Sequence, residues 1–254
     1  MPISRPVRER KVMLNRFSRS QILLGDDAME RLKRARVAVF GVGGVGGYVC
    51  EALVRSGVGA FDIVDNDKVA LTNINRQIIA TEKTVGKYKV DVMKERMLDI
   101  NPDVIVRTYP SFFLPENADD LPFTEYDYVI DAIDTVTAKI GLVLKCNEDG
   151  IPIMSSMGAG NKIEAGAFKV ADIYKTKMCP LAKVMRYELK KRGIKKLKVV
   201  YSEEIPLTPC HETGEELAKG KKSVPGSLAF VPSVAGLIIA GEVVKDLTGV
   251  AGKF

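Results

Sequence analysis

A glycine-rich loop is the first feature of this sequence whose residue types and spacing could do chemistry. Four glycines follow the apolar run at residues 36–40 in the order G-V-G-G-V-G, namely Gly41, Gly43, Gly44 and Gly46. Between a strand and a helix, such glycines permit a tight turn and let backbone N–H groups approach a phosphate. Asp65, at the end of the next apolar run, is placed to accept hydrogen bonds from ribose hydroxyls. The pattern predicts an adenine-nucleotide site and leaves NAD, FAD, S-adenosylmethionine and ATP open.

The polar segment after Asp65 favours ATP among these nucleotides. It carries acid, amide and guanidinium groups on one loop, namely Asp67, Asn73, Arg76 and Gln77. Attack at the α-phosphorus of a triphosphate expels pyrophosphate, whose growing negative charge must be stabilised, whereas hydride transfer needs no such cationic clamp. Arg76 suits that task through its bidentate fork, and Lys89 suits it as a point charge. We therefore expect these residues to bind ATP.

A second acidic group ends another predicted strand. Asp134 closes the run V-I-D-A-I-D, at the carboxyl edge of the sheet, where ligands bind in folds of this kind. A carboxylate there would hold Mg²⁺ bridging the phosphates. The alternative interpretation makes Asp134 the N-cap of the following helix. Both roles stay open at this point.

Alternating strand and helix patterns must position these groups. Strands are expected at residues 36–40, 61–65, 104–109, 128–133 and 151–154, with helices between them. Such alternation predicts an α/β, Rossmann-like, three-layer αβα fold with a mostly parallel sheet. We expect a single domain over residues 1–254. It comprises an N-terminal arm and helix (1–35, the helix from residue 26 to 36), a nucleotide-binding core (36–158), and a mixed C-terminal extension (159–254) with strands near 167–173 and 198–202 and a basic helix.

Composition and charge restrict the class of protein. The four cysteines lie far apart, which argues against a zinc ribbon or a disulfide framework and suits the cytoplasm. No signal peptide is evident. Residues 227–244 are apolar, but Pro232 interrupts them and Glu242 lies near their end, so a helix packed on the sheet is expected rather than a membrane span.

The positive charge is concentrated in one segment. Between residues 183 and 198, eight basic residues accompany a single acid, Glu188, and they are Lys183, Arg186, Lys190, Lys191, Arg192, Lys195, Lys196 and Lys198. The segment is either a solvated helix face or a footprint for a phosphate backbone, which clustered Lys and Arg bind by releasing counterions. The residues alone leave these interpretations equal.

Residues 16–158 resemble the ubiquitin-activating-enzyme-like superfamily, whose bacterial members adenylate carboxylates. The resemblance lies in RFSRSQILLG, GVGGVG, VDNDKVALTNINRQ, the GKYK–INP helix and VIDAID. It implies catalytic roles for Arg76, Lys89 and Asp134. It also implies a homodimer in which Arg19 is offered to the neighbouring subunit's triphosphate, and it leaves open a monovalent cation at the dimer interface and a sulfur-transfer protein partner.

Within the superfamily, the sequence is similar to the tRNA threonylcarbamoyladenosine dehydratase branch. IDAIDTVTAK, the stretch from IPIMSSMGAGN to ADIYKT, CPLAKVMR and VVYSEE carry this similarity. The branch uses ATP and Mg²⁺ to activate the carboxylate of a modified adenosine beside the anticodon, and internal attack then closes a ring with net loss of water. A tRNA substrate would give the basic segment a purpose, so a nucleic-acid footprint becomes the favoured interpretation.

The sequence departs from the branch at some positions, and other functions stay open. Cys179 stands where the branch has an acidic residue, and we interpret it as a packing residue. His211, the only histidine, is expected at the surface, and the chain is short near residues 210–224. The nearest alternative is an adenylyltransferase that activates the C-terminal glycine of a ubiquitin-like sulfur carrier. A nucleotide-binding partner protein without turnover is a further alternative.

Overall fold

A computed structural model describes residues 14–211 and 224–250. Most of the predicted N-terminal arm and most of the segment at 210–224 lie outside this range. The described residues form a seven-stranded sheet in the order β3-β2-β1-β4-β5-β7-β6, parallel except between β6 and β7. The strands are β1 (Arg36–Phe40), β2 (Ala60–Val64), β3 (Ile105–Tyr109), β4 (Tyr128–Asp131), β5 (Ile153–Ser156), β6 (Phe168–Asp172) and β7 (Lys198–Ser202).

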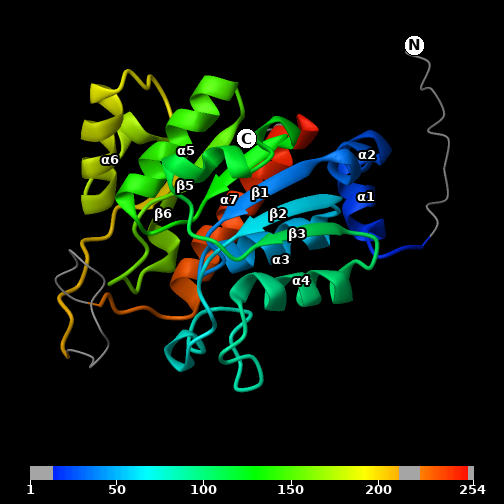
Figure 1. The fold of residues 1–254 in the computed structure, drawn as a ribbon, viewed down its shortest axis with the longest axis horizontal. Helices are drawn as coiled ribbons and strands as arrows, with labels where there is room; N and C mark the ends of the chain where they lie inside the picture. Colours follow the sequence, from blue (N-terminus) through cyan, green and yellow to red (C-terminus); the bar gives the residue numbers. More distant parts are fainter. Residues whose placement is uncertain (1–13, 212–223, 251–254) are drawn as a thin grey trace, which may run out of the picture.

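Helices cover both faces of this sheet (Figure 1). On one face, α3 (Gly46–Ser56), α4 (Lys89–Ile100) and α7 (Phe230–Thr248) bury side chains such as Val49, Met93 and Ile239 in one core. On the other face, α5 (Val136–Asp149) and α6 (Pro180–Lys191) enclose two further clusters. The predicted α/β, three-layer fold with a mostly parallel sheet is confirmed.

The shorter elements complete the chain. They are α1 (Ser18–Leu24), α2 (Asp26–Arg34) and the 3₁₀ turns η1 (Leu71–Asn73), η2 (Pro115–Asp120), η3 (Phe123–Glu125), η4 (Ala165–Ala167) and η5 (Ile173–Lys175). The predicted helix 26–36 ends early, because Ala35 is extended and leads directly into β1. The predicted strand 128–133 also ends early, at Asp131, so Ile133 and Asp134 lie in the loop beyond β4.

The fifth strand begins two residues later than predicted. Gly150 ends α5 with a φ of 70°, in the left-handed region that favours glycine. The amide of Ile151 still donates to the carbonyl of Cys146, and the paired residues of β5 begin at Ile153. Ile151, the first residue of the predicted strand, is therefore bonded to the end of α5 and does not belong to β5.

The apolar segment 227–244 forms the expected packed helix. Pro232 lies in the first turn of α7, where its missing N–H would have no intrahelical partner, so it does not interrupt the helix. A Cβ on Gly236 would lie 2.5 Å from the carbonyl oxygen of Val45, so a glycine there lets α7 approach the glycine-rich loop. Among the helices of residues 14–211 and 224–250, none is long and apolar enough to cross a membrane.

Candidate active site

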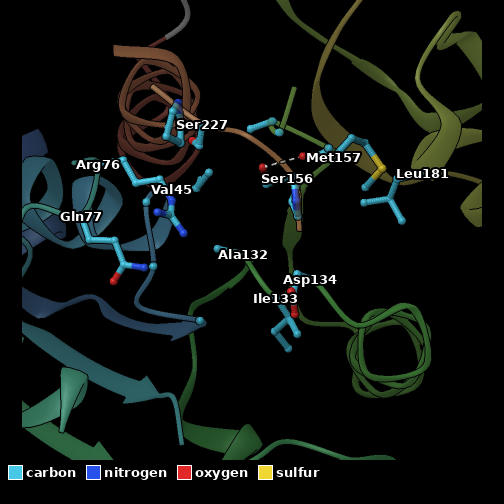
Figure 2. Close-up of a pocket in the computed structure, with 18 of the residues that line it drawn as sticks. Val45, Arg76, Gln77, Ala132, Ile133, Asp134, Ser156, Met157, Leu181 and Ser227 are labelled. Atoms are coloured by element: carbon cyan, nitrogen blue, oxygen red, sulfur yellow. Dashed lines mark hydrogen bonds between the residues drawn. The ribbon is translucent and has the colours of Figure 1, made fainter. Parts of the chain in front are cut away.

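A cavity of about 770 Å³ opens at the carboxyl ends of the central parallel strands. It lies where the chain order reverses, between β1, which leads to β2 and β3, and β4, which leads to β5. Open α/β sheets bind ligands at such a switch point. Figure 2 shows Arg76 and Gln77 on one side of this hollow, and Asp134 and Ser156 on another.

Three of the four glycines of the loop divide into two kinds. Gly41 has a φ of 90°, and a Cβ on it would lie 2.6 Å from the carbonyl oxygen of Ala132. A Cβ on Gly46 would lie 1.8 Å from the carbonyl oxygen of Gly41, so these two glycines are required for close backbone packing. Gly43 has no such neighbour, because its nearest atom is Nε2 of Gln77 at 3.8 Å. Its missing side chain leaves room in the cavity.

Asp65 holds the glycine-rich loop in place. One carboxylate oxygen accepts a hydrogen bond from the amide of Val42 at 2.7 Å, and the other accepts from the amide of Asp67 at 2.9 Å. Burial raises the pKa of the Asp65 carboxyl, against the opposing influence of Lys89 and the two amides. The sequence predicted a ribose ligand at this position, and the structure adds that the same carboxylate fixes the loop.

The polar loop after Asp65 is braced by its own hydrogen bonds. Arg76 is half-buried and donates to the carbonyl of Thr72 at 2.8 Å and to Oδ1 of Asn75 at 3.0 Å. Asn73 is buried, and its side-chain oxygen accepts from the amide of Ala70 at 3.1 Å. Both residues line the cavity, so the loop presents a fixed guanidinium to it.

Gln77 carries an unsatisfied polar atom in its buried side chain. The side chain of Gln77 is buried and lines the cavity. Among the described residues, its Oε1 is the one buried side-chain nitrogen or oxygen without a hydrogen-bond partner. An orphaned buried acceptor is costly. The side-chain atom of Gln77 that lies beside Gly43 is Nε2, at 3.8 Å from the position of a Cβ there.

The side chain of Lys89 lines the cavity and forms an ion pair with Asp67. It begins α4 and is buried, and its Nζ lies 2.6 Å from Oδ2 of Asp67, which is mostly exposed. The backbone supports the pair, because the amide of Lys89 donates to the carbonyl of Asp67 at 3.0 Å. The ammonium is thus held at the cavity wall beside the polar loop.

Asp134 lies in the loop between β4 and α5 and lines the cavity. Its side chain accepts a long hydrogen bond of 3.4 Å from the hydroxyl of Thr135. The alternative that Asp134 caps the next helix is wrong, because α5 begins at Val136 and its N-cap residue is Thr135. No group of three or more His, Cys, Asp or Glu residues suited to a metal occurs in residues 14–211 and 224–250.

A buried ion pair beneath this loop escaped the sequence analysis. Lys139 and Asp131 are both fully buried, with Nζ 3.0 Å from Oδ1. Nζ also donates to the carbonyl of Ile133 at 3.0 Å, and the amide of Ile133 donates to Oδ1 of Asp131 at 3.2 Å. The hydroxyl of Ser155 donates to the other carboxylate oxygen. The pair therefore fixes the turn that carries Asp134.

Replacing Lys139 with methionine is expected to lower the free energy of unfolding by about 3–5 kcal/mol, because Asp131 would keep an uncompensated buried charge. Denaturant titration measures the change. The control is Lys245→Met, since Lys245 is half-exposed and pairs with Glu242 at the surface, where about 1 kcal/mol or less is expected. Adding Asp131→Asn to Lys139→Met should recover part of the loss. Equal stability of Lys139→Met and the unaltered protein would contradict this account of the turn.

The basic segment is only partly available to a partner. Two of its eight residues are committed to the fold: Arg186 bonds to Thr176, and Lys198 pairs with Glu242 at 2.7 Å and with Asp246 at 2.9 Å. The other six side chains are exposed on α6 and the turn after it, and they are Lys183, Lys190, Lys191, Arg192, Lys195 and Lys196. Arg192 also pairs with Glu188.

Arg19 is not brought to the cavity of its own chain. It is exposed on α1, next to Phe17, whose ring packs near Gly57 at the C-terminal end of α3. The N-terminal end of α3 adjoins the glycine-rich loop at the carboxyl ends of the strands. The helix α1 therefore lies at the amino ends of the strands, as Figure 1 shows. The sequence motif alone could not reveal this separation.

The two residues singled out as departures lie in different surroundings. Cys179 is buried and lines the cavity, with its sulfur 3.8 Å from the position of a Cβ on Gly158. Its packing role stays a prediction. His211 is exposed, as expected, next to the exposed Cys210.

Comparisons with known proteins agree with this geometry. The ThiF family matches residues 17–253. The chain is 48% identical over 242 residues to the tRNA threonylcarbamoyladenosine dehydratase of Bacillus subtilis, covering 92% of this chain and 95% of that protein. The crystal structure of the E. coli enzyme of that name with AMP bound has a TM-score of 0.84 and 33% identity, and the match covers 96% of this chain and 100% of that one. The crystal structure with ATP bound has a TM-score of 0.83 and 32% identity, and the match covers 94% of this chain and 98% of that one. The chain therefore belongs to the ThiF family.

Proposed function

We propose that this protein is an ATP-dependent tRNA threonylcarbamoyladenosine dehydratase of the cytoplasm. The observation that carries the proposal is the cavity at the β1–β4 switch point. Its lining brings together the open space beside Gly43, the guanidinium of Arg76, the ammonium of Lys89 and the carboxylate of Asp134. The 48% identity to the B. subtilis dehydratase across nearly the whole chain supports the choice of reaction.

The cavity residues fit ATP and Mg²⁺. The space beside Gly43 would admit the phosphates, and Nε2 of Gln77 lies beside that space. Arg76 and Lys89 would stabilise the charge that develops as pyrophosphate leaves. Asp134 would hold Mg²⁺, which proteins often bind through one or two carboxylates together with substrate phosphates.

The proposed reaction balances without an enzyme nucleophile. A carboxylate oxygen of the modified adenosine attacks the α-phosphorus, and the bond to pyrophosphate breaks with its electron pair. A nucleophilic atom of the same side chain then attacks the acyl carbon, loses a proton and expels AMP. The substrate loses the elements of one water, and the carboxylate oxygen leaves on AMP.

We also propose that the exposed residues of α6 and its following turn bind the tRNA backbone. Changing Lys190 and Lys191 to Glu is expected to weaken tRNA binding and to reduce the slope of its salt dependence, because fewer counterions are released. Filter binding across a salt series measures both quantities. The matched control reverses Lys33 and Arg34, which are exposed on α2. Equal effects of the two charge reversals would return the basic segment to the role of a solvated surface.

A homodimer completes the proposal. Arg19 is exposed far from its own cavity, and beside it Ile22 and Leu23 are 71% and 83% exposed. Apolar side chains of this size on one short helix suit burial against a second copy of the chain. In such a dimer Arg19 would reach the partner's triphosphate.

AMP release distinguishes this function from its rivals. With ATP and Mg²⁺, we expect AMP release to require tRNA bearing threonylcarbamoyladenosine and to be absent with unmodified tRNA. A sulfur-carrier adenylyltransferase would respond instead to a ubiquitin-like carrier protein, and a binding protein without turnover would release no AMP.

A further inference from the structure

A buried ammonium lies in the cavity on the side away from the glycine-rich loop. Lys162 is 3% exposed and lines the cavity. It follows β5, and in the sheet order β1, β4, β5 the strand β4, which leads to Asp134, separates it from the glycine loop. The site described above assigns Lys162 no role, and the nucleotide residues all follow β1, β2 or β4. Lys162 therefore lies in the part of the cavity left for the second substrate.

The charge of Lys162 is incompletely compensated. Nζ donates to the carbonyl oxygen of Glu204 at 2.6 Å. The carboxylate of Glu204 is nearby, but its two oxygens accept from the amides of Ile163 and Glu164 at 2.9 and 3.0 Å. Within the described residues, no carboxylate lies close enough to Lys162 to form an ion pair. Burial lowers the pKa of the Lys162 ammonium, while Cys179 and Glu204 oppose that shift.

The backbone before Lys162 is held rigidly. Asn161 has a φ of 58°, which is uncommon for a residue other than glycine. Its amide donates to the carbonyl of Gly226 at 2.7 Å, and its side-chain oxygen accepts from the amide of Gly226 at 2.6 Å. The amide of Leu207 donates to the carbonyl of Asn161 at 2.7 Å. Three hydrogen bonds thus hold Asn161 in the left-handed region, which asparagine adopts more readily than other residues with a side chain.

We propose that Lys162 binds the substrate carboxylate and presents it to the α-phosphorus of ATP. The inference rests on the proposed function and names the group that recognises its substrate. A carboxylate and a triphosphate repel one another, and a buried ammonium at the carboxylate end offsets that repulsion. A charge-assisted hydrogen bond in a dry site also distinguishes the modified nucleoside from unmodified adenosine.

Binding without ATP tests the inference directly. The protein is titrated with two tRNAs that are identical except for the threonylcarbamoyl group. We expect it to bind the modified tRNA about tenfold to a hundredfold more tightly, as one charged hydrogen bond predicts. Lys162→Met should bind both tRNAs equally, and Lys162→Arg should restore part of the preference. Contacts to the tRNA backbone are the same in both complexes, so they do not contribute to the difference in affinity.

Turnover and controls separate recognition from structural damage. Lys162→Met should raise KM for modified tRNA by about tenfold or more and leave the affinity for ATP alone unchanged. Lys162→Gln, which can still donate to Glu204, should show the same loss if Lys162→Met fails to fold. The control Lys169→Met removes an exposed lysine that pairs with Glu203 outside the cavity, and it should behave like the unaltered protein.

Three results would overturn the inference. An unchanged preference in Lys162→Met and Lys162→Gln, in a protein that still releases AMP, would refute the role of Lys162 and leave the proposed function intact. A parallel loss of ATP affinity would assign Lys162 to the nucleotide. A failure of the unaltered protein to turn over or prefer the modified tRNA would refute both proposals.

Discussion

Replacing Arg76 with alanine is expected to lower kcat/KM for AMP release by about 10²–10³-fold, the usual effect of removing one preorganised group that stabilises transition-state charge. The guanidinium is fixed by the carbonyl of Thr72 and the side chain of Asn75, so it reaches the cavity wall already oriented. Its charge would stabilise the departing pyrophosphate. Initial rates of AMP formation at varied ATP measure the effect.

The matched control for this change is Arg34→Ala. Arg34 is largely exposed on α2 and pairs with Glu30 at the surface, so both activity and stability should be preserved. Thermal unfolding shows whether Arg76→Ala keeps its fold. Full activity of a folded Arg76→Ala protein would exclude Arg76 from the triphosphate site.

Replacing Gly46 with alanine is expected to lower the free energy of unfolding by about 3 kcal/mol, because the added Cβ would lie 1.8 Å from the carbonyl oxygen of Gly41. Backbone atoms are involved on both sides, so relief requires the strand and the helix to move apart. Gly43→Ala is the matched partner within the same loop. Its Cβ would enter open space, so stability should change by about 0.5 kcal/mol or less.

The two glycine variants should also differ in their effect on nucleotide binding. Gly43→Ala places a methyl group where the phosphates are proposed to lie, so its KM for ATP should rise by about tenfold with the fold intact. Denaturant titration and initial-rate kinetics measure the two effects separately. A stable Gly46→Ala protein would contradict the packing of the loop, and an unchanged KM in Gly43→Ala would place the phosphates elsewhere.

The core of the fold could be predicted from the sequence because its signals are local. The strand at residues 36–40, the glycine loop and the next helix follow one another directly, and β1 has the bounds that its β-branched run predicts. Asp65 could be placed because it directly follows the next strand, β2. Local patterns also located the helix that ends before Asn101, since Pro102 cannot continue it.

Other features depend on contacts between distant segments and gave no local signal. Asp131 and Lys139 carry no periodic pattern, and only the folded loop shows that they form a fully buried pair. No sequence pattern singles out Lys162, which is buried next to Asn161, a residue bound to Gly226, 65 residues away. The sequence does not distinguish the eight basic residues of the segment at 183–198 from one another, but the structure shows that Lys198 forms ion pairs with α7.

The nucleoside mass after turnover tests the central claim most directly. The protein is incubated with ATP, Mg²⁺ and tRNA bearing threonylcarbamoyladenosine, and the tRNA is digested to nucleosides and weighed by mass spectrometry. The account predicts that the modified nucleoside loses the mass of one water, with one AMP formed for each nucleoside converted and no conversion when ATP is left out. An unchanged nucleoside mass, or conversion without AMP, would contradict it.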